Sequence, residues 1–335
     1  MNIEIKKYTP ETILPELIDL LNRKYGSHKN FDYFIKDYNA AFTFCVKNRN
    51  IQFEPIAVYS NGELRAYAAI IKDNRLKDGE VFFGFFESSN EPEIFNLLWN
   101  ELKILAKKLG ASLIKGPING SIWHQYRTVK ESNGSTFFKS EVISETYYYD
   151  FLRSRKPKLV IDYYSAYREK FSAIINAGKP SYEKLSDYGF SIQVAKNASE
   201  TDLQQIASLS RKIFNANWGF TDLSDEEFLQ LYSAEKLESH LSKLYLLRKG
   251  SDIVGFSNIL KGDESTLIFK TIGVLPEYHR LGLGNALAFK AHLDAERDGI
   301  KKMIYALIKE DNNIKNFPKD DAVIFRKYSA FEFKI

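Results

Sequence analysis

The sequence predicts an α/β protein that contains one fold twice, each copy a mixed, mostly antiparallel sheet flanked by helices. The length of 335 residues exceeds what one ordinary core holds and suits two domains of roughly 150 residues each. Strand and helix patterns also follow one another in the same order in both halves. A repeated order of elements is typical of a tandem duplication.

The first half shows the order strand, helix, three strands, helix and strand. Its clearest signal is the Asn61-Gly62 turn, because both residue types tolerate the positive φ that a tight hairpin needs. The 3.6-residue apolar period marks the helices, and Gly110 closes the second of them. We expect strands at 3–8, 54–59, 64–71, 81–87 and 113–115, and helices at 11–25 and 92–109.

The second half repeats this order with an additional helix. We expect strands at 191–195, 244–248, 253–260, 266–274 and 303–308, and helices at 201–214, 225–237 and 283–298. Ser199 or Thr201 is suited to cap the first of these helices. A helical stretch over 165–187 is expected to dock the two halves together, which places the domain boundary after residue 188.

The composition of the chain indicates which partners and metal sites are not expected. The net charge of +4 is spread along the chain without a run of five basic residues, so no nucleic-acid partner is expected. No segment approaches the ~18 apolar residues of a membrane span, and the N-terminus lacks a signal peptide, so we expect a cytoplasmic protein without a membrane partner. Cys45 is the single cysteine, which excludes an internal disulfide. The five histidines lack paired ligand spacing, so no metal is expected.

The segment 269–287, FKTIGVLPEYHRLGLGNAL, carries the chemistry. It leads from an apolar strand through a loop into a long helix. Gly282 and Gly284 leave room for a ligand to approach the backbone, and the helix N-terminus and Arg280 add positive charge. The pattern predicts a phosphate cradle built from the amides of residues 280–286: Arg280, Leu281, Gly282, Leu283, Gly284, Asn285 and Ala286.

The run from His279 to Gly284 resembles the acyl-CoA signature Gln/Arg-x-x-Gly-x-Gly/Ala of the GCN5-related N-acetyltransferase (GNAT) family. The family usually has Gln or Arg where His279 stands, and a histidine donates to phosphate with a charge that depends on pH. The resemblance implies acetyl-CoA, or another acyl-CoA, as co-substrate. It further implies that backbone groups around Ile272 and Val274 bind the pantetheine arm.

Two further features follow from the resemblance. Strand 303–308 is expected to splay away from strand 266–274 and leave a slot for the cofactor. The turn after it contains Asn312 and Asn313, of which Asn312 is assigned to the cofactor side, with a helix cap as the alternative role for either residue. The domain that binds acyl-CoA would span residues 189–335.

The first half, residues 1–188, resembles a degenerate GNAT copy. Its segment 88–92, SSNEP, has no glycine and carries an acid where phosphates would lie, so we expect this half to shape the acceptor site instead of binding coenzyme A. The loop 116–127 is rich in polar and aromatic residues. Such a loop is consistent with a structural turn and helix cap, and also with a ligand-binding loop.

The resemblance implies direct attack of an amine on the thioester, without a covalent enzyme intermediate. The site then needs a donor for the developing oxyanion, for which a backbone N–H near Val274 is suited, and an acid for the departing thiolate. The chain lacks the family's Tyr-x-x-x-Gly-Phe pattern. Tyr328 is the nearest replacement and Tyr305 the second choice, although both also suit core positions. Many relatives have a carboxylate on the strand before the cradle, where this chain has Lys270 and Thr271, with Glu264 just before the strand. Water or groups of the substrate are then the alternative base.

These observations favour an N-acetyltransferase that moves an acyl group from acyl-CoA to the amine of a small molecule. Two alternatives stay open. One is a Fem-type aminoacyl-transfer enzyme, which uses charged tRNA and which the cradle and mild charge disfavour. The other is a non-catalytic acyl-CoA sensor, which the absent base favours. The sequence leaves the acceptor, the acyl length and the oligomeric state undetermined.

Overall fold

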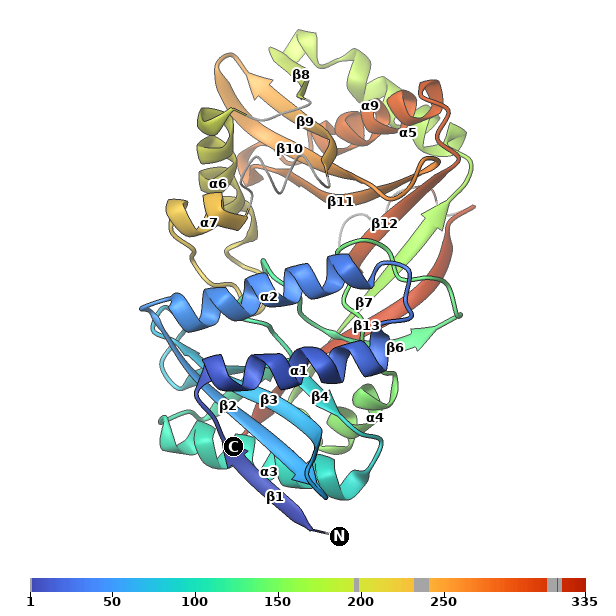
Figure 1. Ribbon diagram of the computed structural model, residues 1–335. Helices are drawn as coiled ribbons and strands as arrows, with labels where there is room; N and C mark the ends of the chain where they lie inside the picture. The colour runs from blue at the N-terminus through green and yellow to red at the C-terminus, as the bar shows by residue number, and fades with distance from the viewer. Residues whose placement is uncertain (1, 196–198, 232–240, 312–317, 319–320) are drawn as a thin grey trace. The chain divides into compact units, whose positions relative to one another are not determined.

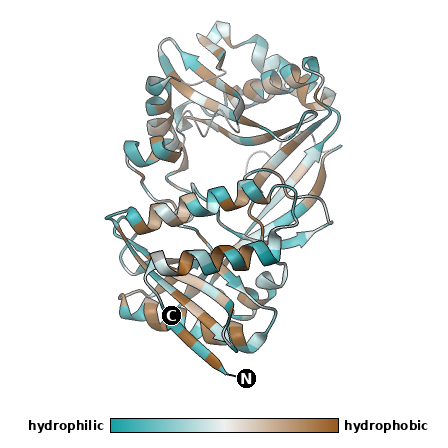
Figure 2. Ribbon diagram, in the orientation of Figure 1, coloured by the Kyte–Doolittle hydropathy of each residue, from teal (hydrophilic) through white to brown (hydrophobic). Residues whose placement is uncertain are grey.

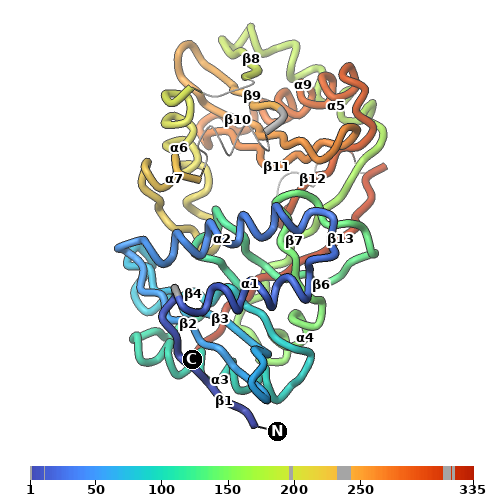
Figure 3. Tube along the Cα trace, in the orientation of Figure 1, coloured from blue at the N-terminus to red at the C-terminus, as the bar shows by residue number. Residues whose placement is uncertain are grey.

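The computed structural model describes residues 2–195, 199–231, 241–311, 318 and 321–335 (Figure 1). The chain forms two compact units. Unit 1 comprises the chain up to Tyr163 together with Arg326–Ile335, and unit 2 comprises Tyr164–Phe325. The last ten residues of the chain therefore belong to the unit built mainly from the first half, as the trace of the chain shows (Figure 3).

Unit 1 contains a mixed sheet in the order β1-β2-β3-β4-β5-β13. Neighbouring strands are antiparallel except β4 and β5, which are parallel. Asn61 and Gly62 have φ values of 53° and 81° and form the expected hairpin turn. The strands are β1 (Ile3–Lys7), β2 (Ile51–Ser60), β3 (Glu63–Asp73), β4 (Glu80–Ser88), β5 (Leu113–Gly116) and β13 (Val323–Lys334), with β6 (Thr128–Ser132) paired to β13.

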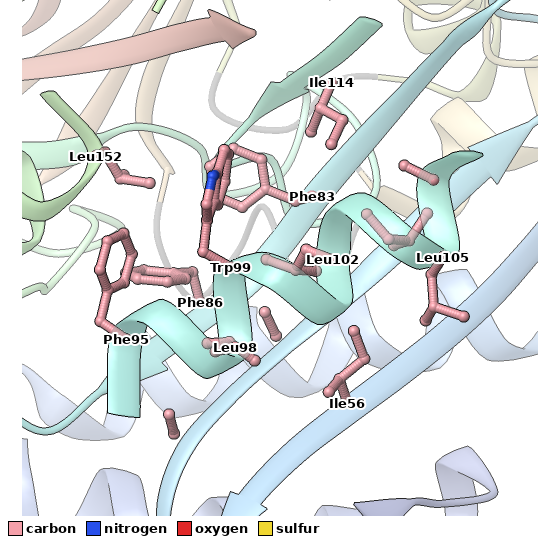
Figure 4. Close-up of a cluster of buried hydrophobic side chains, with 14 of the residues drawn as sticks. Ile56, Phe83, Phe86, Phe95, Leu98, Trp99, Leu102, Leu105, Ile114 and Leu152 are labelled. Carbon is pink, nitrogen blue, oxygen red and sulfur yellow. The ribbon is translucent and has the colours of Figure 1, made fainter. Parts of the chain in front are cut away.

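Helices pack on the sheet of unit 1 (Figure 1). Helix α3 (Pro92–Lys108) buries an apolar stripe that includes Trp99 and Leu102 against alternate residues of β2 and β3 (Figure 4). Helix α1 (Pro10–Tyr25) contacts β2 and β3, and helix α2 (Phe31–Lys47) contacts β2. Both helices carry alternating hydrophobic and hydrophilic bands (Figure 2). Helix α4 (Tyr147–Ser154) completes the set of α-helices described in this unit.

Unit 2 has a sheet in the order β7-β12-β11-β10-β9-β8. Strands β8 to β11 are antiparallel neighbours, and β11 and β12 are parallel. Its strands are β7 (Leu159–Arg168), which begins in unit 1, β8 (Phe190–Ala195), β9 (Leu241–Lys249), β10 (Asp252–Lys261), β11 (Thr266–Val274) and β12 (Lys302–Lys309). The expected mixed, mostly antiparallel sheets flanked by helices are confirmed.

Three helices of unit 2, α6, α7 and α9, begin within one residue of the predicted positions. Ser199, one of the two expected caps, forms a capping box with Asp202 at the start of α6. The helix expected at 225–237 is seen as α7 (Asp225–Leu231), and its remaining residues lie outside the described part of the chain. The other helices are α5 (Ser172–Glu183), α6 (Glu200–Phe214) and α9 (Leu283–Arg297), with short 3-10 turns at Ser186–Tyr188 and Pro276–Tyr278.

The compact units do not divide after residue 188 as the sequence suggested. Residues up to Arg168 form the strand β7 instead of the start of a helix. Helix α5 then packs on α9 within unit 2, and Gly178 permits this approach, since a Cβ there would lie 2.6 Å from the carbonyl oxygen of Asn285. No helix in the described ranges has both the length and the apolar character needed to cross a bilayer.

Candidate functional site

The two central strands of unit 2 separate partway along their length. β11 and β12 pair in parallel only from Thr266–Lys302 to Phe269–Tyr305. Beyond this point β12 lies beside β7, and the Leu307 amide donates to the Ser165 hydroxyl at 3.0 Å. β11 remains paired with β10 as far as Val274, with a bulge at Lys270. The splayed strands expected from the sequence are thus present, and one edge of β11 from Lys270 to Val274 is left without its strand partner.

The loop after β11 adopts an unusual backbone conformation. Arg280 and Gly282 have φ values of 73° and 74°, which is uncommon for a residue such as arginine. The His279 ring nitrogen Nε2 lies 3.1 Å from the Val274 carbonyl oxygen and must donate to it. Nδ1 of His279 then becomes a donor for phosphate only when the ring is charged. The loop is therefore held against the end of β11 while its backbone turns at alternate positions.

Different features of the structure explain why glycine stands at positions 282 and 284. A Cβ at Gly282 would lie 2.5 Å from the Ser181 hydroxyl and would strain a positive-φ position. A Cβ at Gly284 would meet only Ile272 Cδ1, at 4.0 Å, in ordinary contact. Because an interior glycine costs a helix about 1 kcal/mol relative to alanine, packing within the protein does not account for Gly284.

Helix α9 begins at this loop without a side-chain cap, and its first recorded helical bond runs from the Ala286 amide to the Gly282 carbonyl oxygen. Its first amides are therefore suited to an anion such as a diphosphate. Among the predicted binding residues, His279, Arg280, Leu281 and Asn285 are exposed, Ile272, Val274, Gly282 and Gly284 are half-buried, and Leu283 and Ala286 are buried. Asn312 lies outside the described residues.

Residues 203–316 match the model of the acetyltransferase (GNAT) family. Residues 203–316 are thereby identified as a GNAT domain. The matched segment contains the splayed strands, the loop and helix α9. None of the curated protein sequences is similar enough to match the chain.

Solved structures show the GNAT fold over the whole chain. A tandem GNAT protein from the clavulanic acid biosynthesis pathway aligns over 99% of this chain and 98% of its own, with a TM-score of 0.60 and 9% identity. A GCN5-related glucosamine N-acetyltransferase region of a fungal multi-domain GH3 β-N-acetylglucosaminidase covers 99% of this chain and 38% of its own, with a TM-score of 0.59 and 11% identity. A GNAT from Sphaerobacter thermophilus covers 99% and 95%, with a TM-score of 0.53 and 12% identity. The expected tandem GNAT fold is confirmed.

Tyr305 lies in the core of unit 2. Its hydroxyl is 2.7 Å from Nε2 of the fully buried His292, whose Nδ1 is 2.7 Å from the Ala288 carbonyl oxygen. A carbonyl only accepts, so Nδ1 carries the proton and Tyr305 donates to Nε2. The hydroxyl is thus already used within the fold, and its role as second-choice acid stays a prediction.

His292 should make folding sensitive to acid. Burial lowers the pKa of His292 to about 4, below the usual 6.5. The contribution of the neutral His292 side chain to the free energy of unfolding is therefore complete above pH 6.5 and is lost as the pH falls toward 4. A shift of this size corresponds to about 3 kcal/mol. Urea denaturation between pH 7 and pH 4 should show this loss in the wild type and a smaller one in His292→Gln. The half-buried His28→Gln is the control, and an equal pH dependence in wild type and His292→Gln would contradict the expectation.

Tyr328 lies on β13 in unit 1, whereas the loop lies in unit 2. The segment around it is a strand and not the last helix that carries the family's usual tyrosine. Tyr328 is fully buried, and its hydroxyl donates to Glu141, which also accepts from Arg326 at 2.5 Å and from the Phe138 amide at 2.7 Å. These contacts give Tyr328 a structural role, while its role as general acid stays a prediction.

Tyr328→Phe separates these two roles. Loss of a hydrogen bond to a charged group should lower the free energy of unfolding by about 2 kcal/mol. The rate of thiol release from acetyl-CoA in the folded enzyme should change little. Urea denaturation and a thiol-release assay on the same preparation measure both quantities. A fall of several orders of magnitude in the rate, with unchanged stability, would instead support the acid role.

In unit 1, the chain after β5 fills the space that corresponds to the gap between β11 and β12 in unit 2. β4 and β5 pair from Glu80–Leu113 to Phe82–Lys115, and the chain after β5 then folds back onto β4. The Ile118 amide donates to the Phe83 carbonyl at 2.8 Å, and the Phe85 amide donates to Asn119 Oδ1 at 2.7 Å. Beyond the opening, Glu91 precedes α3 and pairs with Arg65. A coenzyme would have to displace this loop.

Sequence reasoning missed several buried polar groups that have unpartnered atoms. In unit 2, Asn258 of β10 pairs across from Thr271 at the β11 bulge, is 8% exposed and has an unpartnered Oδ1. In unit 1, the loop 116–127 contributes Gln125 and Arg127 to a pocket. The only signal for this pocket in the sequence was the polar and aromatic composition of that loop.

Proposed function

We propose that this protein is an acyl-CoA-dependent N-acetyltransferase that acts on the amine of a small molecule. The observation that carries the proposal is the uncapped start of α9 beside Gly284, a glycine with open space around it. The match of residues 203–316 to the GNAT family model and the splayed β11 and β12 support it. Acetyl-CoA or a related acyl-CoA would be the co-substrate.

Each part of the site has a role in this proposal. The amides of residues 280–286 would bind the diphosphate, and Arg280 would add a full positive charge. The free edge of β11 around Ile272 and Val274 would bind the pantetheine arm in the manner of a missing strand. The conformation of Arg280 fits this role, because a non-glycine residue at positive φ costs about 1–2 kcal/mol and such strain concentrates at functional sites.

The transfer itself would proceed by direct attack. Bound acyl-CoA supplies the thioester carbonyl, and the neutral acceptor amine forms the new C–N bond as the C–S bond breaks. A backbone N–H near Val274 would donate to the developing oxyanion. The unpartnered Oδ1 of Asn258 is suited to accept from an N–H group of the acceptor. The amine loses a proton and the departing thiolate gains one.

One observation favours the acyl-CoA sensor as a second candidate function. β11 has no acidic residue from Thr266 to Val274, so this strand supplies no general base. The Fem-type aminoacyl-transfer alternative has no comparable support, because the loop before α9 resembles an acyl-CoA signature in all but His279.

Incubation of the full chain with acetyl-CoA and a panel of amines tests the proposal, with thiol release as the signal. The panel should include amino sugars, because one similar structure is named a glucosamine N-acetyltransferase region. Amine-dependent thiol release would support the enzyme. Calorimetric binding of acetyl-CoA without turnover on any amine would favour the sensor, and the absence of binding would refute both.

A further inference from the structure

Unit 1 contains a buried positive charge without a matching carboxylate. Arg127 is 8% exposed, and its guanidinium carbon lies 3.5 Å from the ring centre of Tyr126 and 4.1 Å from that of Tyr163. Among the described residues no ion pair involves Arg127, and its Nε has no hydrogen-bond partner. The buried Arg326 of the same unit, by contrast, is paired with Glu141. Because an unpaired buried charge is costly, Arg127 points to a missing anion.

Arg127 lines a pocket that also contains other unpartnered groups. We call it the Arg127 pocket; it is open to solvent and is lined among others by Tyr38, Glu87, Gln125, Arg127, Ile143 and Tyr148. The Tyr38 hydroxyl and Gln125 Oε1 have no hydrogen-bond partner, although Tyr38 is 2% and Gln125 7% exposed. The pocket therefore offers an N–H donor, a carbonyl acceptor and a hydroxyl that a ligand could satisfy together.

The charge of the pocket favours an anion. Its acidic residue, Glu87, is already matched by Lys24 at 3.3 Å and accepts from Tyr148 at 2.7 Å. Arg127 is therefore the charge that remains to be balanced. The planar edge of a guanidinium fits a planar carboxylate. Apolar residues such as Ile143 also line the pocket and are suited to contact a small hydrocarbon group.

The loop that carries Arg127 is ordered by its own backbone. The Arg127 amide donates to the Pro117 carbonyl at 2.9 Å, and the Asn119 amide donates to the Gln125 carbonyl at 2.9 Å. Arg127 itself has a φ of 88°, a strained value for this residue type. The Tyr126 and Tyr163 rings, which meet edge to face, both lie against the guanidinium, and one of its NH2 groups donates to the Tyr126 hydroxyl. The donor is thus fixed in place before any ligand arrives, which lowers the entropy cost of binding.

We propose that the Arg127 pocket binds a small organic acid that carries an amino or hydroxyl group beside its carboxylate. Arg127 pairs with the carboxylate, and Gln125 and Tyr38 bond to the neighbouring N–H or O–H group. The residues named here lie in unit 1, and binding of the acid does not depend on acyltransferase activity. In this proposal the polar loop 116–127 is a binding loop as well as a structural turn.

Calorimetry on the full chain tests this proposal with lactate and L-alanine as probes. Propionate lacks the second group, inorganic phosphate is an anion of different shape, and methylammonium has the opposite charge. We expect saturable binding of lactate or alanine at millimolar concentration, and binding of propionate weaker by about 10-fold, the effect of one lost hydrogen bond. No binding of either probe, or tighter binding of phosphate, would refute the proposal.

Two variants test whether the ligand binds in the Arg127 pocket. Arg127→Lys retains the charge but removes the guanidinium edge, so it should weaken binding by at least about 10-fold. Tyr38→Phe, a smaller change that should leave the fold intact, should weaken it by about 3-fold to 10-fold. Arg155→Lys is the matched control, because Arg155 also stacks on an aromatic ring, that of Phe95 at 5.1 Å, but does not line the pocket. Equal binding by wild type and Tyr38→Phe, together with full binding by a folded Arg127→Lys, would place the ligand elsewhere.

Discussion

Gly284→Val should abolish most acetyl-CoA binding, with an increase in Kd of at least about 100-fold, while the protein remains folded. The fold has room for a Cβ at this position, and valine is no worse than glycine inside a helix. The branched side chain would instead keep a diphosphate from the first amides of α9. The loss of one or two charge-assisted hydrogen bonds accounts for an effect of this size, about 3 kcal/mol. Calorimetry and thermal unfolding on the same sample measure both quantities.

Two further variants control this experiment. Gly284→Ala should bind nearly as well as the wild type, since the family signature accepts alanine there. Gly299 has a φ of 75°, and no atom lies within 4 Å of the position that a Cβ would take, so Gly299→Val imposes backbone strain at the opposite end of α9. It should cost stability but leave the Kd unchanged. Normal coenzyme binding by Gly284→Val would overturn the assignment of the loop as a cradle.

Arg326→Met should lower the free energy of unfolding of unit 1 by about 3–5 kcal/mol. The side chains of Arg326 and Glu141 are both 0% exposed, and their ion pair measures 2.5 Å. Burial raises the pKa of Glu141, and without Arg326 its carboxyl must take up a proton or remain as a buried charge. Urea denaturation followed by far-ultraviolet circular dichroism measures the loss.

The neighbouring residue of the same strand provides a control. Lys327 pairs with Glu131 at 2.8 Å, but its side chain is 39% exposed, so Lys327→Met should change stability by less than about 1 kcal/mol. The double variant Arg326→Met with Glu141→Leu should recover part of the lost stability, because it removes both charges. A loss no larger than that of Lys327→Met would show that Arg326 contributes only as an exposed charge would.

Local signals predicted most of the elements, while the cradle stays a prediction. The Asn61-Gly62 turn and the loop around Gly282 need particular backbone angles that their residues supply, so their structure follows from a few neighbouring positions. Helix α2 was missed, although it buries Phe34, Phe42 and other residues on one face. The stretch 165–168 was taken for a helix because its place beside β12 depends on distant parts of the chain.

Long-range contacts explain what sequence could not provide. The Glu141 carboxyl that holds Tyr328 comes from a segment 187 residues away, so no local pattern marks Tyr328 as a buried residue of β13. The loop 116–127 folds against β4 and places Arg127 where no carboxylate of the described residues pairs with it. The charge balance of such a pocket is a property of the folded unit and has no signature in composition.

The position of β13 in the chain has a consequence for biosynthesis. The strand that pairs with β5 through Phe331–Gly116 and Lys334–Leu113 is synthesised only after the whole of unit 2 has been made. The nascent first part of unit 1 therefore emerges with an open sheet edge, a form prone to aberrant strand pairing, until β13 has been made. A premature stop codon before β13 would damage the part of unit 1 that was made much earlier.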